Sequence, residues 1–298
     1  MATVTDIQQP DAEPADRPET PTDWTLDIGP RRGMFQVPLA EIWRYRDLLY
    51  LLVRRDFVAF YKQTILGPLW FLIQPILTTL MFTLVFGRIA GISTDGAPAI
   101  LFYLAGVTLW GYFAECLNKT ATTFTDNAAL FGKVYFPRMI APLAVVVSNL
   151  MKLSIQLCLF LAFLGYYIAT GQANPNTFAL LLPFLIVVLA AISLGFGLIF
   201  SAMTTKYRDL KFLLSFGVQL AMYITPIIYP VSSIPEKYAT LIRLNPLTPL
   251  VETFRYGFLG VGDFTTGGLV YASLFAVGIL SIGVLIFNRV EATFMDTV

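Results

Sequence analysis

The sequence predicts an all-α integral membrane protein with six transmembrane helices, and three observations lead to this prediction. Hydrophobic residues make up 56% of the 298 residues and charged residues only 13%, whereas a typical soluble domain has roughly 25% charged residues. Several uncharged runs approach or exceed the roughly 20 apolar residues that a membrane-crossing helix needs. Short charged segments separate these runs, as expected for loops between spans.

Three regions are expected along the chain: a disordered acidic tail, a cytoplasmic segment with an amphipathic interfacial helix, and the six-helix membrane domain, at residues 1–23, 24–64 and 65–298. The proline-rich tail cannot bury enough apolar surface to become ordered. Within the second region, Ile42, Val53 and Phe57 share one helical stripe. This segment is too charged to cross a membrane, so it predicts one or two helices lying along the cytoplasmic surface.

The six spans are predicted from the gaps between charged residues. They are expected at residues 63–87, 96–114, 140–169, 177–203, 212–235 and 264–288. Most of the 20 Lys and Arg residues lie on the side that holds the N-terminal segment. By the positive-inside rule, this distribution predicts a multi-pass membrane protein with both termini in the cytoplasm.

The connection between the fifth and sixth spans is long and contains two helix-like pieces, residues 235–244 and 249–259. Asn245-Pro246 separates them, because a residue before proline disfavours the helical conformation. Each piece is too short to cross a membrane. The pair is either re-entrant or interfacial on the outer side, or a helical hairpin that faces solvent and has no role in transport.

Residues 127–138 form a cytoplasmic stretch between the second and third spans. They predict a short helix whose aromatic side chains recur at one-turn spacing and are flanked by cations: Phe131, Lys133, Tyr135, Phe136, Pro137 and Arg138. One interpretation is a surface that docks onto a soluble partner. The alternative is an ordinary amphipathic loop helix lying on lipid headgroups.

The composition excludes several kinds of chemistry. The chain has no histidine and only two cysteines, so His-based metal sites, histidine catalysis and a disulfide framework are not expected. Gly132-Lys133 lacks the upstream glycine and the following Ser or Thr of a phosphate-binding loop. We therefore expect no catalytic site and no cofactor in this chain, with any nucleotide hydrolysed by another subunit. No basic block suggests nucleic acid as a partner.

Lys152 is the ionisable residue placed deepest in a predicted span. Asn149 and Gln156 share its helical face, so a polar stripe along a transport path is one interpretation. The other is a buried lysine satisfied by Glu115 or by neighbouring carbonyls. No carboxylate is expected deep in a helix, which argues against a proton- or sodium-coupled carrier and against an enzyme built on paired acids.

Several motifs taken together resemble one family. They are Tyr45-Arg46-Asp47-Leu48, Arg54-Arg55-Asp56, the run from Tyr61 through Gly67-Pro68-Leu69-Trp70 to Gln74-Pro75, the Gly132–Arg138 stretch, Tyr207-Arg208-Asp209, Thr225-Pro226-Ile227-Ile228-Tyr229-Pro230 and Asn245-Pro246. This combination, covering about residues 24–298, resembles the permease subunits of type-2 ABC exporters for polysaccharides such as O-antigen, teichoic acid and capsule.

The resemblance implies a homodimer of permeases in the bacterial cytoplasmic (inner) membrane. This dimer would work with two copies of an ABC ATPase, which would bind ATP and Mg²⁺. The resemblance also implies a polysaccharide cargo on a polyprenyl diphosphate lipid. Residues 127–138 would be the coupling helix that docks into the ATPase, and the pair after Pro230 would be outer gate helices. The cytoplasmic gate helix would carry Arg54, Arg55, Tyr61 and Lys62. Its cations would meet the diphosphate, or else they only anchor the chain to the membrane.

In that family the first and fifth spans line the channel. The residues implied for sugar contact are therefore Trp70, Phe71, Phe216 and Tyr223. The leading function is export of a lipid-linked polysaccharide, most readily O-antigen. A type-2 ABC exporter for teichoic acid, capsule, a drug or a small lipid is the near alternative. More remote alternatives are a secondary transporter, which would need an intramembrane acid and usually an inverted repeat, and a membrane enzyme of polysaccharide assembly.

Overall fold

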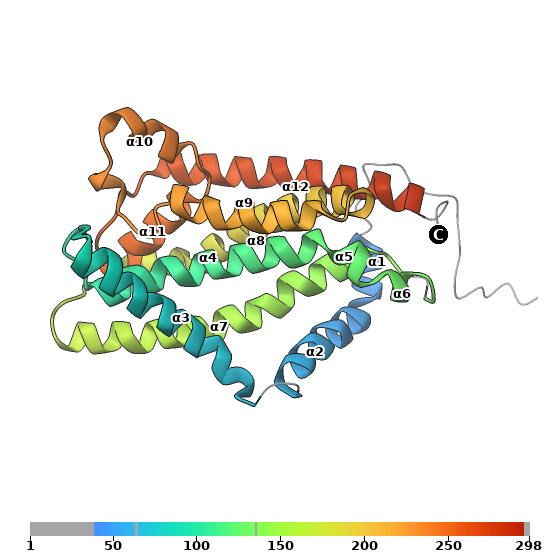
Figure 1. Ribbon diagram of the computed structural model, residues 1–298, viewed down its shortest axis with the longest axis horizontal. Helices are drawn as coiled ribbons and strands as arrows, with labels where there is room; N and C mark the ends of the chain where they lie inside the picture. The colour runs from blue at the N-terminus through green and yellow to red at the C-terminus, as the bar shows by residue number, and fades with distance from the viewer. Residues whose placement is uncertain (1–38, 63–64, 135, 295–298) are drawn as a thin grey trace, which may run out of the picture. The chain divides into compact units, whose positions relative to one another are not determined.

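A computed structural model describes residues 39–62, 65–134 and 136–294, and all of them lie in the unit formed by residues 34–298. Within the described part, every regular element is a helix. The acidic tail predicted at residues 1–23 lies outside it. The α-helices are α1 Leu39–Arg44, α2 Arg46–Lys62, α3 Trp70–Phe82, α4 Ala99–Ala121, α5 Thr123–Asp126, α6 Ala128–Phe131, α7 Ile140–Ala169, α8 Leu182–Lys206, α9 Leu210–Ile224, α10 Glu236–Arg243, α11 Thr248–Leu259 and α12 Thr266–Phe294 (Figure 1).

Five helical runs in the described residues are long and apolar enough to cross a membrane. They are Gly67–Ile89, Ala99–Ala121, Ile140–Ala169, Thr177–Lys206 and Thr266–Val290. Each corresponds to one of the six spans expected from the sequence. The first run joins the short helix η1 Gly67–Leu69, α3 and the π-helix η2 Thr83–Ile89, and the fourth joins the 3₁₀ helix η3 Thr177–Leu181 to α8. The multi-pass membrane fold is therefore confirmed.

The remaining expected span, residues 212–235, is a shorter helix. α9 has 15 residues, about 22 Å of helix, whereas the hydrocarbon core is about 30 Å thick. It ends because Thr225, which precedes Pro226, is extended with φ −80° and ψ 139°. The span 212–235 was predicted from its lack of charge alone, which does not take Pro226 into account. A sixth crossing at α9 thus stays a prediction.

The second span extends further than the sequence predicted. It was expected to end before Glu115, but α4 continues to Ala121. Two lysines neutralise the Glu115 carboxylate. Lys119 lies on the next turn of α4, with its Nζ 2.9 Å from a carboxylate oxygen, and Lys152 of α7 forms a second ion pair. The helix can therefore carry this acid without ending.

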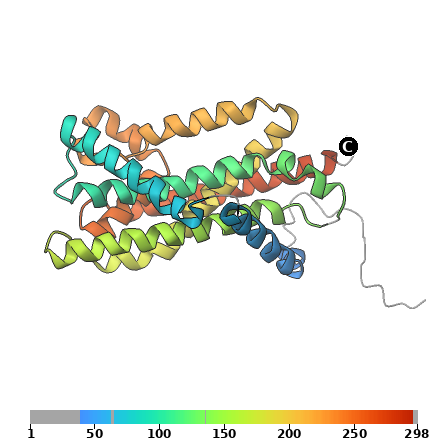
Figure 2. The same ribbon diagram turned by 60° about the horizontal axis from the view of Figure 1, so that its bottom comes forward.

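α4 forms the centre of the bundle. It lies between α9 and α7 (Figure 1), and the turned view keeps that order (Figure 2). It also packs against α3, α8 and α11. In the most apolar stretch of this helix, 72% of the residues are buried. The corresponding share is 17% in the first and in the last candidate span. The hydrophobic core therefore surrounds α4, while α3 and α12 leave most of their surface outside it.

The two short helices predicted between the last spans are present. α10 and α11 lie on either side of Asn245-Pro246. α11 is buried along nearly its whole length and packs against α4, α8 and α12, so the interpretation as a solvent-facing hairpin is wrong for α11. α10 is mostly exposed, with Ile242 as its buried residue.

The predicted amphipathic segment forms two helices, α1 and α2. In α2, Leu52 and Val53 are buried while Arg54 and Arg55 are exposed, and the helix packs against α7. Val53 was expected on the apolar stripe and is confirmed there. The helix thus binds the bundle through one face and leaves its cations on the other, as its charge pattern predicted.

Candidate translocation surface and cytoplasmic docking segment

An ion pair joins α7 to α4 inside the bundle. Lys152 pairs with the Glu115 carboxylate, which Lys119 also contacts, and the Lys152 and Glu115 side chains are only 20% and 26% exposed. The interpretation that Glu115 satisfies Lys152 is therefore confirmed, with both side chains partly rather than fully buried. The alternative of a polar stripe along a path is weakened, because Asn149 and Gln156 are also buried and bonded. Their side-chain amides donate to the Val145 carbonyl at 3.0 Å and to a carbonyl of α3 at 3.3 Å.

The four aromatic residues expected to contact sugar fall into two groups. Trp70, Phe216 and Tyr223 are 42%, 58% and 49% exposed. Phe71 is buried instead, and the Lys152 Nζ lies 5.6 Å from its ring centroid. The predicted sugar contact of Phe71 is therefore wrong for this conformation, because its buried ring lies beside Lys152 and does not reach the surface.

The helices that carry these aromatics contact the bundle through narrow stripes. α3 buries only Phe71, Pro75 and Thr79 among its described residues. α9 buries only Leu214 and Val218. Most of the apolar side chains of both helices therefore remain on the surface of the chain. Such a surface can meet lipid tails, a second copy of the chain or the transported molecule.

The cations expected at a cytoplasmic entrance are on the exposed face of α2. Arg54, Arg55 and Lys62 are all exposed. The Arg55 guanidinium donates to the neighbouring Asp56 carboxylate at 2.9–3.0 Å, so part of its charge is already compensated. The Tyr61 side chain lies outside the described residues. The exposed cations are sterically free to meet an anionic headgroup.

The docking segment, which we define as residues 127–138, differs from its prediction. The helix α6 covers only Ala128–Phe131, and a turn follows at Gly132. Phe131 and Phe136 are buried, with ring centroids 5.5 Å apart, and the buried Arg138 guanidinium lies 5.6 Å from the Phe131 ring centroid. The predicted exposed aromatic face is therefore wrong for both phenylalanines. Tyr135 lies outside the described residues.

The reason is a ring cluster at the end of α4. The Phe124 ring lies 6.0 Å from Phe131 and stacks at 4.6 Å on Phe287 of α12. The contacts of these buried rings attach the segment to the bundle, and the helix does not continue beyond Gly132. Lys133 and Val134 are left exposed, and Pro137 is half-buried. Lys133 and Val134 therefore form the accessible tip of the docking segment.

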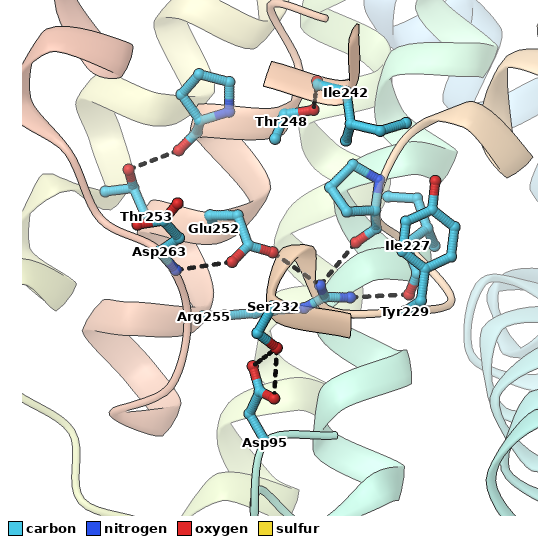
Figure 3. Close-up of polar contacts among 12 residues, drawn as sticks. Asp95, Ile227, Tyr229, Ser232, Ile242, Thr248, Glu252, Thr253, Arg255 and Asp263 are labelled. Atoms are coloured by element: carbon cyan, nitrogen blue, oxygen red, sulfur yellow. Dashed lines mark hydrogen bonds and ion pairs between the residues drawn. The ribbon is translucent and has the colours of Figure 1, made fainter. Parts of the chain in front are cut away.

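A network around a buried arginine, which was not predicted from the sequence, lies near the other end of the bundle. Its centre is Arg255 of α11, which is fully buried. Its guanidinium donates to the Pro226 carbonyl at 2.6 Å and to the Ile227 carbonyl at 2.8 Å (Figure 3). Its carbon Cζ lies 3.6 Å from the Phe102 ring centroid, the arrangement of a cation–π contact.

Glu252 balances the charge of Arg255 one turn away. The guanidinium donates to the Glu252 carboxylate at 3.3 Å, and the Asp263 backbone N–H donates to its other oxygen at 2.8 Å (Figure 3). The expectation that no carboxylate lies deep in a helix is therefore wrong for Glu252. Burial lowers the pKa of Arg255 to about 10, so the guanidinium is charged at neutral pH. A Glu-x-x-Arg spacing in an otherwise apolar helix was the available sequence signal.

This network fixes the extended turn that follows α9. Arg255 holds two of its carbonyls, the Asn245 amide donates to the Thr225 hydroxyl at 2.8 Å, and the Tyr229 hydroxyl donates to the Tyr223 carbonyl at 3.0 Å. α9 is thus attached through its C-terminal turn to the buried helix α11. No group of three or more His, Cys, Asp or Glu side chains in the described residues could hold a metal ion.

The amino-acid sequence is similar to those of known transport proteins. A family model described as "ABC-2 type transporter" matches residues 47–259. The chain is 28% identical over 251 residues to "O-antigen export system permease protein RfbA" of Klebsiella pneumoniae, covering 84% of this chain and 94% of the relative. It is 31% identical over 217 residues to the Myxococcus xanthus protein of the same name, covering 72% and 81%. "Polysialic acid transport protein KpsM" of Escherichia coli is 24% identical over 234 residues, covering 78% and 89%.

Proposed function

Because the chain belongs to the ABC-2 type transporter family, we propose that it is the permease half of an ATP-driven exporter. The cargo is a polyprenyl-diphosphate-linked polysaccharide, with O-antigen as the first candidate, moved outward across the cytoplasmic membrane. The observation that carries this proposal is the similarity to two O-antigen export permeases over most of their length. Similarity to a polysialic acid transport protein supports a polysaccharide more broadly.

The exposed faces of α3 and α9 support the role of a channel wall. Trp70, Phe216 and Tyr223 offer aromatic rings at the surface, and the C–H face of a sugar ring can stack on an aromatic ring without a fixed hydrogen-bond pattern. The two faces belong to helices that pack on α4. In the proposed homodimer, a second copy faces this surface and the two copies enclose the path.

ATP is hydrolysed by a separate subunit in this proposal. The chain has no phosphate-binding loop, so two copies of an ABC ATPase supply the energy. The docking segment receives the movement, with Lys133 and Val134 as the contact tip. The buried rings of Phe131 and Phe136 transmit the movement to α5 and α12, because they pack in one cluster with Phe124 and Phe287 of those helices.

The lipid-linked end of the cargo enters beside α2. Arg54, Arg55 and Lys62 are exposed there, and charge-assisted hydrogen bonds from such cations suit a diphosphate. Since Arg55 already donates to Asp56, Arg54 and Lys62 are the stronger candidates. Replacing both by Gln should reduce export of lipid-linked cargo more than it reduces membrane insertion of the chain.

Deletion and complementation in the native bacterium test the function. Cells without the gene should lose surface polysaccharide and accumulate lipid-linked polymer inside, because synthesis continues while export stops. Affinity purification of the full chain should recover an ABC ATPase, and inactivating the phosphate-binding lysine of that ATPase should reproduce the deletion. Unchanged surface polymer would overturn the polysaccharide assignment in favour of a drug or small lipid. Export that persists without any ATPase partner would favour a secondary transporter.

The class of polymer needs a separate measurement. Teichoic acid and capsule are the alternatives to O-antigen, and all three can be recovered from the cell surface and distinguished by composition. Loss of lipopolysaccharide side chains with other surface polymers intact would support O-antigen. Absence of lipid-linked polymer both inside and outside would contradict export and favour an enzyme of polymer assembly.

A further inference from the structure

Pro75 lies inside the exposed helix α3. A proline has no backbone N–H, so it cannot bond the carbonyl four residues earlier, and its ring also pushes against that carbonyl. In α3 this carbonyl belongs to Phe71. Within a membrane no water is present to bond an unpaired backbone carbonyl, so a neighbouring group has to satisfy it. The position of Pro75 therefore creates a need for an external donor at Phe71.

Gln156 of α7 supplies that donor. Its side-chain amide donates to the Phe71 carbonyl at 3.3 Å, and the contact is buried. Gln156 itself is 6% exposed. A glutamine in an apolar helix is thus explained by a backbone group of another helix, 85 residues away in sequence.

The same point of α3 carries a second attachment. The Phe71 ring is 5.6 Å from the Lys152 Nζ, and Lys152 is one turn before Gln156 on α7. The rest of α3 is loosely held, since its buried stripe consists of Phe71, Pro75 and Thr79. The Thr79 hydroxyl has no hydrogen-bond partner within the described part of the chain. The polar attachment of α3 to α7 is therefore concentrated at one level, next to the proline.

The geometry points to Gln156 as a positioning residue that latches α3 at its proline hinge, Pro75, and so sets the position of the exposed α3 surface that carries Trp70. The segment before the hinge carries Trp70, and the segment after it leads into the π-helix η2. A π-helical stretch is also a common site of local adjustment. When the amide releases the Phe71 carbonyl, the two segments of α3 can change their mutual angle at Pro75. This inference rests on the proposed export function, because it assigns a role to the movement of a channel wall.

A spin-label distance measurement on the full chain in lipid vesicles tests the latch. One label is placed at Leu69→Cys, which is exposed, and the other at the native, exposed Cys158 of α7. Cys116→Ala in every variant avoids a label at the buried cysteine. Labelled chain is diluted with an excess of unlabelled chain, so that distances within one chain dominate.

Three variants distinguish a latch from ordinary packing. Gln156→Leu keeps the volume and removes the donor, so the distance distribution should broaden and the latched population should fall about threefold relative to the released one, the scale measured for hydrogen bonds between membrane helices. Pro75→Ala combined with Gln156→Leu restores the N–H of residue 75, which can bond Phe71 within the helix, so the distribution should narrow again. Asn149→Leu is the matched control, because that amide bonds a carbonyl of its own helix.

The outcomes separate the latch from the function. A Gln156→Leu distribution that superimposes on the native one, or a double variant as broad as the single variant, would overturn the latch. Export of surface polymer, measured in parallel, should fall in Gln156→Leu and recover at least partly in the double variant. Changed distances with unchanged export would overturn the positioning role. If the native chain exports nothing while the distances respond as expected, the export function fails and the hinge itself stands.

Discussion

Replacing Arg255 by methionine should destabilise the chain more than any surface substitution of the same type. Arg255 is fully buried, donates to two carbonyls of the turn after α9, and faces the Glu252 carboxylate at 3.3 Å. Methionine fills a similar volume without any donor. The variant therefore leaves both carbonyls, Pro226 and Ile227, without these bonds, and it leaves Glu252 buried with only the Asp263 N–H.

The size of the effect follows from these contacts. Removing one partner of a buried ion pair costs about 3–5 kcal/mol, since the remaining charge is uncompensated. The free energy of unfolding should fall by about this amount. For a chain of this size, that loss lowers the midpoint of thermal unfolding by on the order of 10 °C. The additional replacement Glu252→Leu should recover part of the loss, because the isolated carboxylate is then absent.

Thermal unfolding of the purified chain in detergent measures this prediction. Arg243→Met is the matched control: Arg243 also forms an ion pair, with Asp263 at 2.8 Å, but its side chain is 62% exposed. An exposed pair contributes about 0–1 kcal/mol, so the control should unfold within a few degrees of the native chain. Equal unfolding midpoints for the Arg255 and Arg243 variants would refute the assignment of Arg255 as the clamp of the turn after α9.

Three further substitutions test other parts of the structure. Lys152→Met should lower the midpoint of thermal unfolding, and adding Glu115→Gln should recover part of it because the partly buried carboxylate, then balanced by Lys119 alone, is removed; a double variant less stable than the single one would contradict the ion pair. Gly283→Ala should cost about 1–3 kcal/mol of unfolding free energy, since a Cβ there would lie 2.5 Å from the Gly195 carbonyl oxygen; unchanged proteolytic resistance would refute the close approach of α8 and α12. Lys133→Glu should reduce surface polymer and ATPase co-purification without changing the unfolding midpoint, and full co-purification would count against docking at this tip.

The structure reduces the number of residues in the docking segment that a partner could contact. The sequence suggested that Phe136 and Arg138 would meet a partner along with Lys133, but both are buried. Substitutions at these two positions should therefore lower stability as well as coupling, so they cannot report docking alone. Lys133 is exposed and separates the two effects. In the proposed docking, the contact residues and the residues that pack on the bundle lie in the same stretch but at different depths.

The membrane fold could be predicted from the sequence because hydrophobicity along the chain is a one-dimensional property. Long uncharged runs marked the spans, and the described helices match five of them. The two wrongly predicted span boundaries, at α9 and α4, have local causes. Pro226 ends α9 early, and Glu115 does not end α4 because two lysines compensate it. The resemblance to polysaccharide export permeases, which needed several motifs at once, is confirmed by the family match.

Contacts between distant residues could not be predicted in the same way. The helical spacing of Phe131, Tyr135 and Phe136 predicted an exposed face, yet whether an aromatic face points outward depends on what lies beside it. Phe287, from the last helix, takes part in the ring cluster that buries this segment. No local pattern contains that information. The same holds for the pairing of Gln156 with Phe71 and of Arg255 with the turn after α9.

These two pairings nevertheless share one physical cause, and that cause is visible in the sequence. A proline inside an apolar helix or directly after it interrupts or ends the backbone hydrogen bonds of that helix, and membrane interiors offer no water to replace them. Pro75 leaves the Phe71 carbonyl to Gln156, and the turn at Pro226 leaves two carbonyls to Arg255. Polar side chains such as Gln156 and Arg255, isolated within otherwise apolar helices, are the donors that such turns require. Both donors hold helices that otherwise contact the bundle through narrow stripes, so the attachments of α3 and α9 depend on a few hydrogen bonds, while α4 is held by packing on several sides.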